Sequence, residues 1–277
     1  METQNDFFVR FWGVRGSVAC PGAATARYGG NTSCLEVRCG DRLLIFDGGT
    51  GIRTLGLHMD KQGKVDADVY FTHTHIDHIQ GLPFFSSAYK KTNRFRLWAG
   101  HLKPDYTLKQ VLSEMMMEPL FPVPISIFGA DISFHDFDAG QILAPAADIA
   151  LRTAPLNHPN RATGYRVDYK GKSICYVTDT EHTPGQPDRN ILGLIDRADL
   201  VIYDSTYTDD EYPKFVGWGH STWQEAVRLC EQAKVGRCVV FHHDPSHDDA
   251  FMDRVAAAAE KMRPGTVVAY EGLTLSP

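Results

Sequence analysis

The chain has 277 residues, of which 43% are hydrophobic, so it is long and apolar enough to bury a sizeable core and is not a disordered chain. Its formal net charge is −6 with Lys and Arg scattered, which excludes a broad basic surface for long nucleic acid. Small anionic substrates stay open, because a bound metal would supply local positive charge that this count omits.

The sequence shows no secretion signal and no membrane span. Its first residues lack a basic start followed by a long apolar core, and no apolar run approaches the roughly 18 residues that cross a bilayer. The six cysteines are dispersed without a CxxC pair, which suits thiols that stay reduced. We therefore expect a cytoplasmic protein with no membrane partner.

Strand-like apolar runs follow one another along the chain, and helical patterns lie between some of them. The predicted strands cover residues 7–14, 33–38, 42–47, 67–73, 95–100, 132–137, 149–154, 164–170, 173–179, 199–205, 237–243 and 266–271. The predicted helices cover residues 107–117, 221–233 and 248–262, with Ser221 as the N-cap of the second. This alternation predicts a layered α/β protein with helices outside the sheets.

Glycine and proline clusters at residues 20–30, 117–124 and 181–188 are typical of loops rather than of linkers between domains. We therefore expect a single domain over residues 1–277, built from two fused halves at roughly 1–147 and 148–277.

Residues 71–81, FTHTHIDHIQG, crowd ionisable side chains into the end of a predicted strand. Imidazole suits zinc, and His73 and His75 can approach one ion from the same side. Asp77 and His78 continue round the turn and can reach a second ion. One tetrahedral zinc cannot use all four and keep a position open for chemistry, so the pattern favours two metals. The alternative is a polar loop whose histidines cluster by chance.

This HxHxDH pattern resembles the metallo-β-lactamase superfamily, and further motifs follow in order over roughly residues 7–272. The resemblance implies an αββα four-layer sandwich, in which two mixed sheets are flanked by helices, and two Zn²⁺ ions, with Mn²⁺ or Fe²⁺ served by the same ligand types. It assigns Asp47 to steadying the ligand loop and Asp179 to bridging the metals. The implied ligands are His73, His75 and His158 for the first metal and Asp77, His78 and His242 for the second.

Some of these residues have simpler interpretations. Taken singly, His158 and Asp179 are also consistent with loop residues that cap a turn. His242 and His243 are adjacent on a strand, so only one can face the metals. We choose His242 because it directly follows the apolar VVF run, and we expect His243 and His247 to lie in the loop or behind the ligands.

The charge of the implied centre indicates the reaction. The net charge of a centre with two Zn²⁺ ions, two carboxylates and a bridging hydroxide is about +1. Such a centre favours the binding of an anionic substrate. Paired metals can hold a hydroxide nucleophile and stabilise the entering and leaving oxygens of a phosphoryl transfer. In this interpretation Asp77 orients or deprotonates the attacking hydroxide.

The segment GWGHSTWQEA resembles the His-Ser/Thr motif of the ribonuclease Z and phosphodiesterase branch. The resemblance implies that His220 stabilises the phosphate and protonates the leaving oxygen, a role worth roughly 10²- to 10⁴-fold in rate. The alternative is that His220 and Ser221 only cap the following helix. Asp204 ends another predicted strand and is expected to support His220 or a ligand, with a structural carboxylate as the alternative.

Residues outside the ligand set are candidates for substrate binding. The segment with Asn31 resembles a loop of this branch that can face the metals, with a plain turn before a strand as the alternative. The run after His158 resembles the GYR strand of the same branch and would place Arg161 or Arg166 near the site, with a solvated arginine as the alternative. Phe84 begins an aromatic and methionine-rich segment, residues 83–128, that can stack on a base, although core packing accounts for most of it. Phe85 and Tyr89 are the other residues of this segment to test.

We therefore expect a metal-dependent phosphodiesterase that acts on a small or cyclic nucleotide, with a homodimer implied by the resemblance. A tRNA 3′-processing endoribonuclease is an alternative, but Asp179 follows His158 by only 21 positions, which two predicted strands fill, so there is no room for a tRNA-gripping arm. A carbonyl hydrolase acting on a lactone, thioester or β-lactam also stays open, as does a non-catalytic metal-binding partner protein.

Overall fold

The computed structural model describes residues 6–277, so residues 1–5, the start of the segment in which no secretion signal is predicted, lie outside the described part. The strands are β1 (Phe7–Gly13), β2 (Cys34–Cys39), β3 (Arg42–Phe46), β4 (Asp66–Phe71), β5 (Arg94–Ala99), β6 (Asp131–Asp136), β7 (Ile142–Ala146), β8 (Ile149–Leu156), β9 (Ala162–Tyr169), β10 (Lys172–Val177), β11 (Leu200–Asp204), β12 (Arg237–Phe241), β13 (Val267–Val268) and β14 (Thr274–Leu275). The α-helices are α1 (Gly51–Met59), α2 (Ile76–Ile79), α3 (Leu108–Met115), α4 (Arg189–Ile195), α5 (Trp223–Gln232) and α6 (Asp249–Met262). Over residues 6–277, none of these helices has the length and apolar character to cross a membrane.

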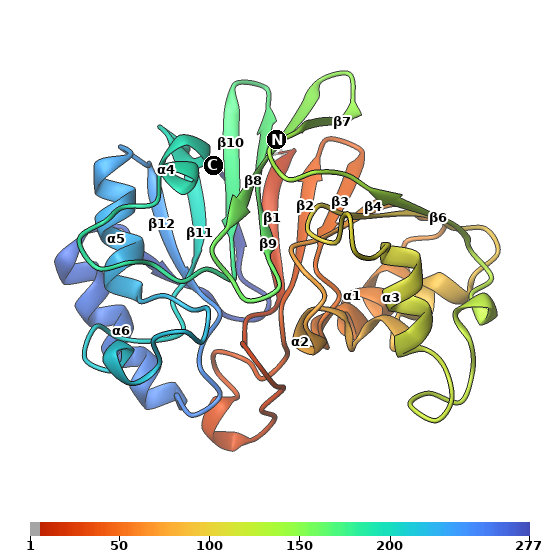
Figure 1. Cartoon of the computed structure of the whole chain (residues 1–277), viewed down its shortest axis with the longest axis horizontal. Coiled ribbons are helices and arrows are strands. Elements are labelled where there is room, and N and C mark those ends of the chain that lie inside the picture. Colours follow the sequence, from red (N-terminus) through yellow and green to blue (C-terminus); the bar gives the residue numbers. More distant parts are fainter. Residues whose placement is uncertain (1–5) are drawn as a thin grey trace.

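Two seven-stranded sheets form the centre of the molecule (Figure 1). The first has the order β14-β1-β2-β3-β4-β5-β6, and the second has the order β13-β12-β11-β10-β9-β8-β7. Each sheet combines parallel and antiparallel pairs: β3 to β6 run parallel, as do β10 to β13, whereas β1 to β3 and β7 to β10 pair antiparallel. The predicted pair of mixed sheets is therefore confirmed.

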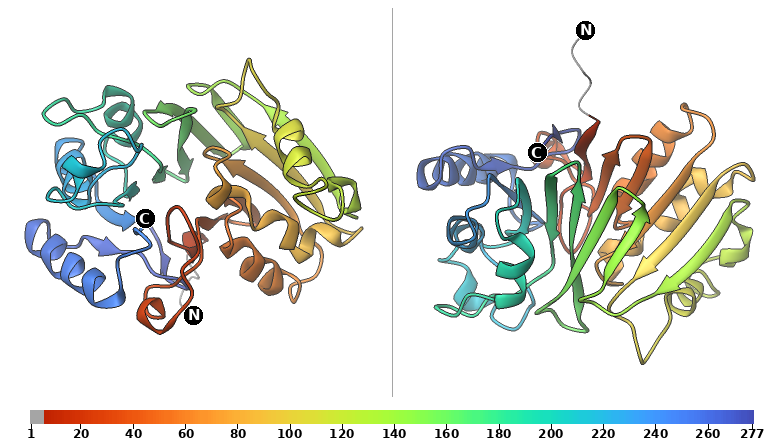
Figure 2. Two further views of the ribbon diagram at one scale, coloured as in Figure 1. Left: turned by 60° about the horizontal axis from the view of Figure 1, so that its bottom comes forward. Right: turned by 90° about the horizontal axis from the view of Figure 1, so that it is seen from above.

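Helices cover the outer face of both sheets, which gives the four layers expected from the sequence (Figure 2). Aromatic side chains such as Phe46, Tyr165 and Phe241 fill the space between the sheets. A second apolar cluster joins the second sheet to α4, α5 and α6, and a third joins the first sheet to α1 and α3. Burial on both faces explains why the central strands read as nearly continuous apolar runs.

The predicted strands are found, but several elements were missed. The short strands β7 and β14 were not predicted. Each belongs to the sheet of the other half of the chain: β7 precedes residue 148 but pairs with β8 in the second sheet, and the C-terminal β14 pairs with β1 in the first sheet. Helix α1 was missed because glycine disfavours helices. Gly51 is nevertheless required in α1, since an added Cβ would lie 2.5 Å from the carbonyl oxygen of Trp12.

The prediction of Ser221 as a helix N-cap was wrong. Thr222 caps α5, and its side chain accepts a hydrogen bond from the backbone N–H of Glu225. Ser221 instead lies within 2.8 Å of His182 Nδ1 through its hydroxyl group. Either residue suits an N-cap chemically, so the sequence could not distinguish them.

The topology brings the carboxyl ends of several strands to one edge of the sandwich. Strands β3 and β4 run parallel in the first sheet, and β8, β10, β11 and β12 share a direction in the second. The loops after these strands therefore meet, and nearly all of the predicted site residues lie on them: Asp47, His73, His75, Asp77, His78, His158, Asp179, Asp204 and His242.

Candidate metal centre

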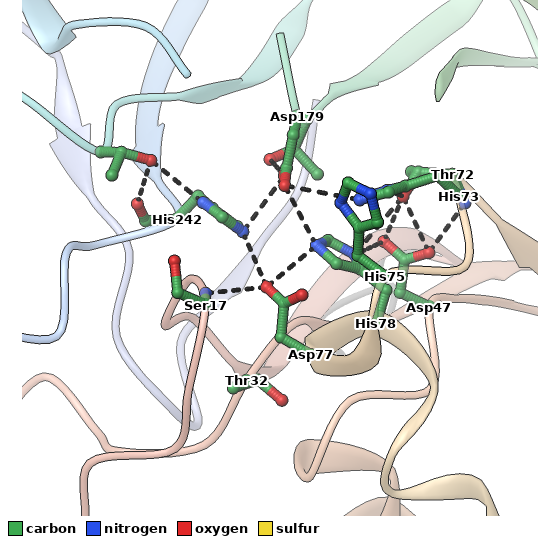
Figure 3. Close-up of polar contacts among 12 residues, drawn as sticks. Ser17, Thr32, Asp47, Thr72, His73, His75, Asp77, His78, Asp179 and His242 are labelled. Carbon is green, nitrogen blue, oxygen red and sulfur yellow. Dashed lines mark hydrogen bonds and ion pairs between the residues drawn. The ribbon is translucent and has the colours of Figure 1, made fainter. Parts of the chain in front are cut away.

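Two groups of potential ligands converge where these loops meet. The first group is His73, His75 and His158, and the second group is Asp77, His78, Asp179 and His242. Within each group the nitrogen and oxygen atoms that can bind an ion all lie within 4.8 Å of one another. Figure 3 shows side chains of the segment that follows β4, among them Asp77 and His78, pointing toward Asp179, which follows β10, and His242, which follows β12. The seven side chains predicted as ligands therefore form a cluster that can bind metal.

Three buried nitrogens in this cluster make no well-aligned hydrogen bond among the described residues and are approached by the carboxylates of Asp77 and Asp179 at 3.1–3.7 Å. They are the Nε2 atoms of His73, His78 and His242. Buried nitrogens without a well-aligned partner are uncommon in folded proteins, so three that converge on two carboxylates indicate a site for a cation. Imidazole nitrogen is a preferred ligand of zinc and its neighbours. The residues present therefore fit a metal.

The opposite nitrogen of each of these rings is held by the protein. Thr72 Oγ1 lies 3.1 Å from His73 Nδ1, Asp47 Oδ2 lies 2.9 Å from His78 Nδ1, and Thr206 Oγ1 lies 3.0 Å from His242 Nδ1. Such contacts fix the orientation of a ligand ring and direct its other nitrogen toward the metal.

Asp47 is the central support of the ligand loop. Its carboxylate accepts hydrogen bonds from the backbone N–H of Thr72 at 2.8 Å and the Tyr176 hydroxyl at 2.9 Å, besides its contact with His78. Through these contacts Asp47 joins the segment that carries Thr72 and His78 to β10 of the other sheet.

Asp179 lies between the two groups. Its Oδ2 atom is 3.7 Å from His73 Nε2 and 3.4 Å from His78 Nε2, and its Oδ1 atom is 3.1 Å from His242 Nε2. No other carboxylate in residues 6–277 approaches histidines of both groups at these distances. Its position is that of a carboxylate that can contact both ions.

The protonation states differ between the groups. Burial lowers the pKa of His73 and of His158, so both are neutral imidazoles, the form that binds metal. Burial also opposes protonation of His78, but the surrounding carboxylates, Asp77 foremost, raise its pKa well above the ordinary value. A protonated His78 offsets part of the negative charge of the second group, and a metal ion would replace that proton.

His220 lies beside both groups, with its ring centre 5.4 Å from that of His158 and 5.0 Å from that of His242. Its Nδ1 atom is 3.0 Å from Asp204 Oδ2. Burial opposes protonation, but Asp204 and then Asp179 raise the pKa of His220 to about 9. A protonated imidazole therefore faces the cluster.

Asp204 is part of a further set of possible ligand atoms with Asp179, His220 and His242. Its carboxylate already accepts hydrogen bonds from the backbone N–H groups of Thr180 and Thr206, and from the Thr206 hydroxyl, in addition to its contact with His220. These bonds occupy its lone pairs, so this set is a hydrogen-bonded support for His220 rather than another ion site.

The structure adds Glu181, which the sequence analysis missed. Its carboxylate accepts hydrogen bonds from the backbone N–H groups of Gly217 at 2.8 Å and Gly219 at 2.7 Å. The Gly219 carbonyl oxygen lies 2.7 Å from His158 Nδ1, and His220 follows directly in the chain. Gly219 has φ +87, and an added Cβ would lie 2.4 Å from the His158 ring, so only glycine fits.

Ser17 is a second missed residue. Its backbone N–H donates to Asp77 Oδ2 at 2.8 Å (Figure 3). The preceding Gly16 packs on the His242 ring, where an added Cβ would lie 2.4 Å from the ring atoms. Ser17 and His242 both have positive φ, at 62 and 65, a strained conformation that clusters at functional sites. The sequence signal was the GS dipeptide after a strand.

The two adjacent histidines do point apart. His242 faces the ligand cluster, whereas His243 Nε2 lies 2.8 Å from the carbonyl oxygen of Ala269. His247 stacks on Phe251 and contacts Glu211. Neither His243 nor His247 belongs to the two groups.

The residues predicted to bind substrate lie in different surroundings. The Asn31 side-chain amide donates to Glu271 at 2.9 Å. Arg166 lies on β9 and binds Asp168 and backbone carbonyl groups instead of the cluster. Phe84 is 58% exposed and meets Phe121 edge to face.

The other two residues singled out in the aromatic segment divide between core and surface. Phe85 is buried and packs against Phe95, so core packing accounts for it. Tyr89 is partly exposed, and its hydroxyl donates to the carbonyl oxygen of Pro83.

Arg161 lines a cleft of about 430 Å³ that also includes His73 and His75. A larger hollow of about 1060 Å³ lies at the opposite end of β3, far from the ligand groups, and several of its charged side chains are paired, as Arg38 is with Glu36. The smaller cleft is therefore the one connected to the candidate metal centre.

The amino-acid sequence matches a known family and its members. Residues 42–243 match the family model described as the beta-lactamase superfamily domain. Ribonuclease Z of Myxococcus xanthus is 22% identical, and the match covers 88% of this chain and 92% of the relative.

Solved structures give the same fold. The metallo-beta-lactamase fold protein YhfI from Bacillus subtilis has a TM-score of 0.72 at 18% identity, with 98% of this chain and 99% of that one covered. A diphosphatase from the PhnP family has a TM-score of 0.68 at 18% identity, with 97% and 96% covered.

Proposed function

The chain is a hydrolase of the β-lactamase superfamily, and from this premise we propose that it cleaves a phosphodiester bond in a small or cyclic nucleotide. The observation that carries the proposal is His220, a buried imidazole held by Asp204 between His158 and His242. A phosphodiester needs both a centre that attracts its anion and an acid for the oxygen that leaves, and this site offers both.

The proposed cofactors are two Zn²⁺ ions, with Mn²⁺ or Fe²⁺ served by the same ligand types. The first group would hold one ion and the second group the other, with Asp179 shared. When bound, such ions activate water at neutral pH and neutralise the charge that develops on a phosphoryl group.

The side chains of this protein would then divide the remaining work. Asp77, fixed by the Ser17 N–H, would orient the attacking water and accept its proton. His220 would donate a proton to the departing oxygen, while Asp204 holds its Nδ1–H and so directs Nε2 outward. Mutations that remove such an acid cost roughly 10²- to 10⁴-fold in rate.

A tRNA 3′-processing activity is the second candidate, because the ribonuclease Z of Myxococcus xanthus matches most of the chain. Two observations weigh against it. Asp179 follows His158 by only 21 positions, and the hairpin of β9 and β10 occupies most of them, so no segment is left for an arm there. The net charge of −6 also disfavours an extended polyanion. We also propose that the substrate is a small anionic diester, that the protein forms a homodimer and that it has no membrane partner.

The test begins with elemental analysis of the purified protein, for which we expect about two transition-metal ions per chain. The protein is then assayed on bis(p-nitrophenyl) phosphate, cyclic mononucleotides, a precursor tRNA and a lactone. Cleavage of the diesters with the tRNA left intact supports the proposal. Preferred cleavage of tRNA or of the lactone would replace it, and bound metal without turnover would indicate a binding protein.

A further inference from the structure

The cleft beside His75 has the size of a pocket for one small molecule. Its volume of about 430 Å³ lies within the ~300–1,000 Å³ that is typical of small-ligand sites. One wall is the candidate metal centre itself, through His73 and His75. The other walls come from the loop before α3, from α3 and from the turn after His158. A substrate whose phosphate lies at the metals would therefore place one of its arms here.

The charges of this cleft disfavour a second phosphate. Among the described residues that line it, Arg161 is the one fixed cation, and it is already held by the Asp105 carboxylate at 3.0 Å and the Lys103 carbonyl oxygen at 2.6 Å. Glu114 also lines the cleft, and no cation among the described residues is paired with it. On the side of the cleft away from the candidate metal centre, the arm that enters therefore meets the exposed carboxylate of Glu114, which attracts hydroxyl or amino donors and disfavours a second anionic group there.

Other side chains suit an uncharged ring. Leu102 and Val111 give the cleft apolar surface, and the exposed ring of Tyr106, 54% accessible, lines it as well. A large exposed aromatic ring is a ready surface for stacking, because every nucleobase has a π-face. Neither α3 nor the loop before it carries a predicted metal ligand, so these residues are free to determine which arm is accepted.

We propose that this cleft binds the uncharged, nucleoside-like arm of the diester, with Tyr106 against its planar ring and Glu114 accepting hydrogen bonds from its hydroxyl or amino groups. The inference rests on the proposed function and narrows it. The preferred substrates are diesters with one phosphate, and a nucleotide that carries a further phosphate on this arm is rejected.

The first experiment measures binding without turnover. Thymidine is titrated into the metal-loaded protein and followed by saturation-transfer NMR, and Tyr106→Ala is expected to raise its Kd about tenfold. Tyr270→Ala, which removes another partly exposed tyrosine outside this cleft, serves as the matched control and should leave the Kd unchanged. Absence of thymidine binding to the unmodified protein, or equal loss in both variants, would overturn the proposal.

The second experiment compares two chromogenic diesters, thymidine 5′-(p-nitrophenyl phosphate) and its 3′-phosphorylated form. We expect the unphosphorylated diester to have the higher kcat/KM, and Glu114→Lys to shift the ratio by about tenfold toward the phosphorylated one. A preference for the phosphorylated form in the unmodified protein would refute the charge argument.

The two failures can be told apart. If bis(p-nitrophenyl) phosphate and both thymidine diesters are left intact, the proposed phosphodiesterase activity fails, while thymidine binding still decides the role of the cleft. If bis(p-nitrophenyl) phosphate is cleaved but Tyr106→Ala changes neither thymidine binding nor the KM for the thymidine diester, only the cleft proposal fails.

Discussion

The two ligand groups are neighbours but differ in chemistry. The first group consists of three imidazoles, and His75 is partly exposed to the cleft. The second group contains two carboxylates and two imidazoles, all of them buried. Carboxylates attract a dication in the low-dielectric interior, whereas neutral imidazoles bind it only through their lone pairs. From this comparison we infer that the second group would hold an ion firmly, whereas the first group would present an ion to the substrate.

Removing the shared carboxylate should have the largest effect. Asp179→Asn keeps the shape of the side chain but removes the negative charge that lies near histidines of both groups. We expect fewer than about one ion per chain and a loss of diesterase activity greater than about 10⁴-fold. Elemental analysis and steady-state kinetics check this, with the surface variant Asp131→Asn as the control. Retention of both ions would show that Asp179 does not bridge.

Asp77→Ala separates the two groups. Asp77 belongs to the second group alone, so this variant should lose one ion, keep the ion of the first group and lose about 10³-fold in activity. Elemental analysis measures the stoichiometry. Loss of both ions would mean that the first group depends on the second, and the division of roles would not hold.

His220→Ala tests the acid outside both groups. Because His220 is held by Asp204 and is not needed for either group, the variant should keep both ions and lose roughly 10²- to 10⁴-fold in kcat. His58→Ala, on the surface of α1, is the matched control. Unchanged kcat on a diester with a poor leaving group would remove the proton-donor role.

Glu181→Gln should have the smallest effect, and only on the first group. The variant weakens the carboxylate contacts that fix Gly219, whose carbonyl oxygen orients His158. Outer contacts of this kind are worth roughly 10- to 100-fold in metal affinity, so we expect about a tenfold loss for one ion and none for the other.

Competition with a chelator measures the two affinities, and Glu231→Gln is a control outside the site. In the metal-free protein, the ¹⁵N shifts of His158 should also report a change of tautomer. Equal weakening of both ions would indicate a general loss of structure instead of a positioning role.

Much of the fold could be read locally. Apolar runs such as LLIF and VVF identify buried strands wherever they lie, because burial on both faces demands them. The missed elements had no such signal. Strands β7 and β14 are short strands at the sheet edges. In α1, Gly51 allows close contact with β1 and Gly56 allows close contact with Phe85 and Ser86, at the expense of helix propensity.

The sequence by itself determined the ligand types and their places after strands, since His73, His75, Asp77 and His78 adjoin one another and chemistry limits what such a cluster can bind. Only the tertiary structure decided which residues support and surround them. Glu181, Ser17, Tyr106 and Glu114 are ordinary residues in sequence, because their roles depend on distances across loops that come together only when two sheets pack.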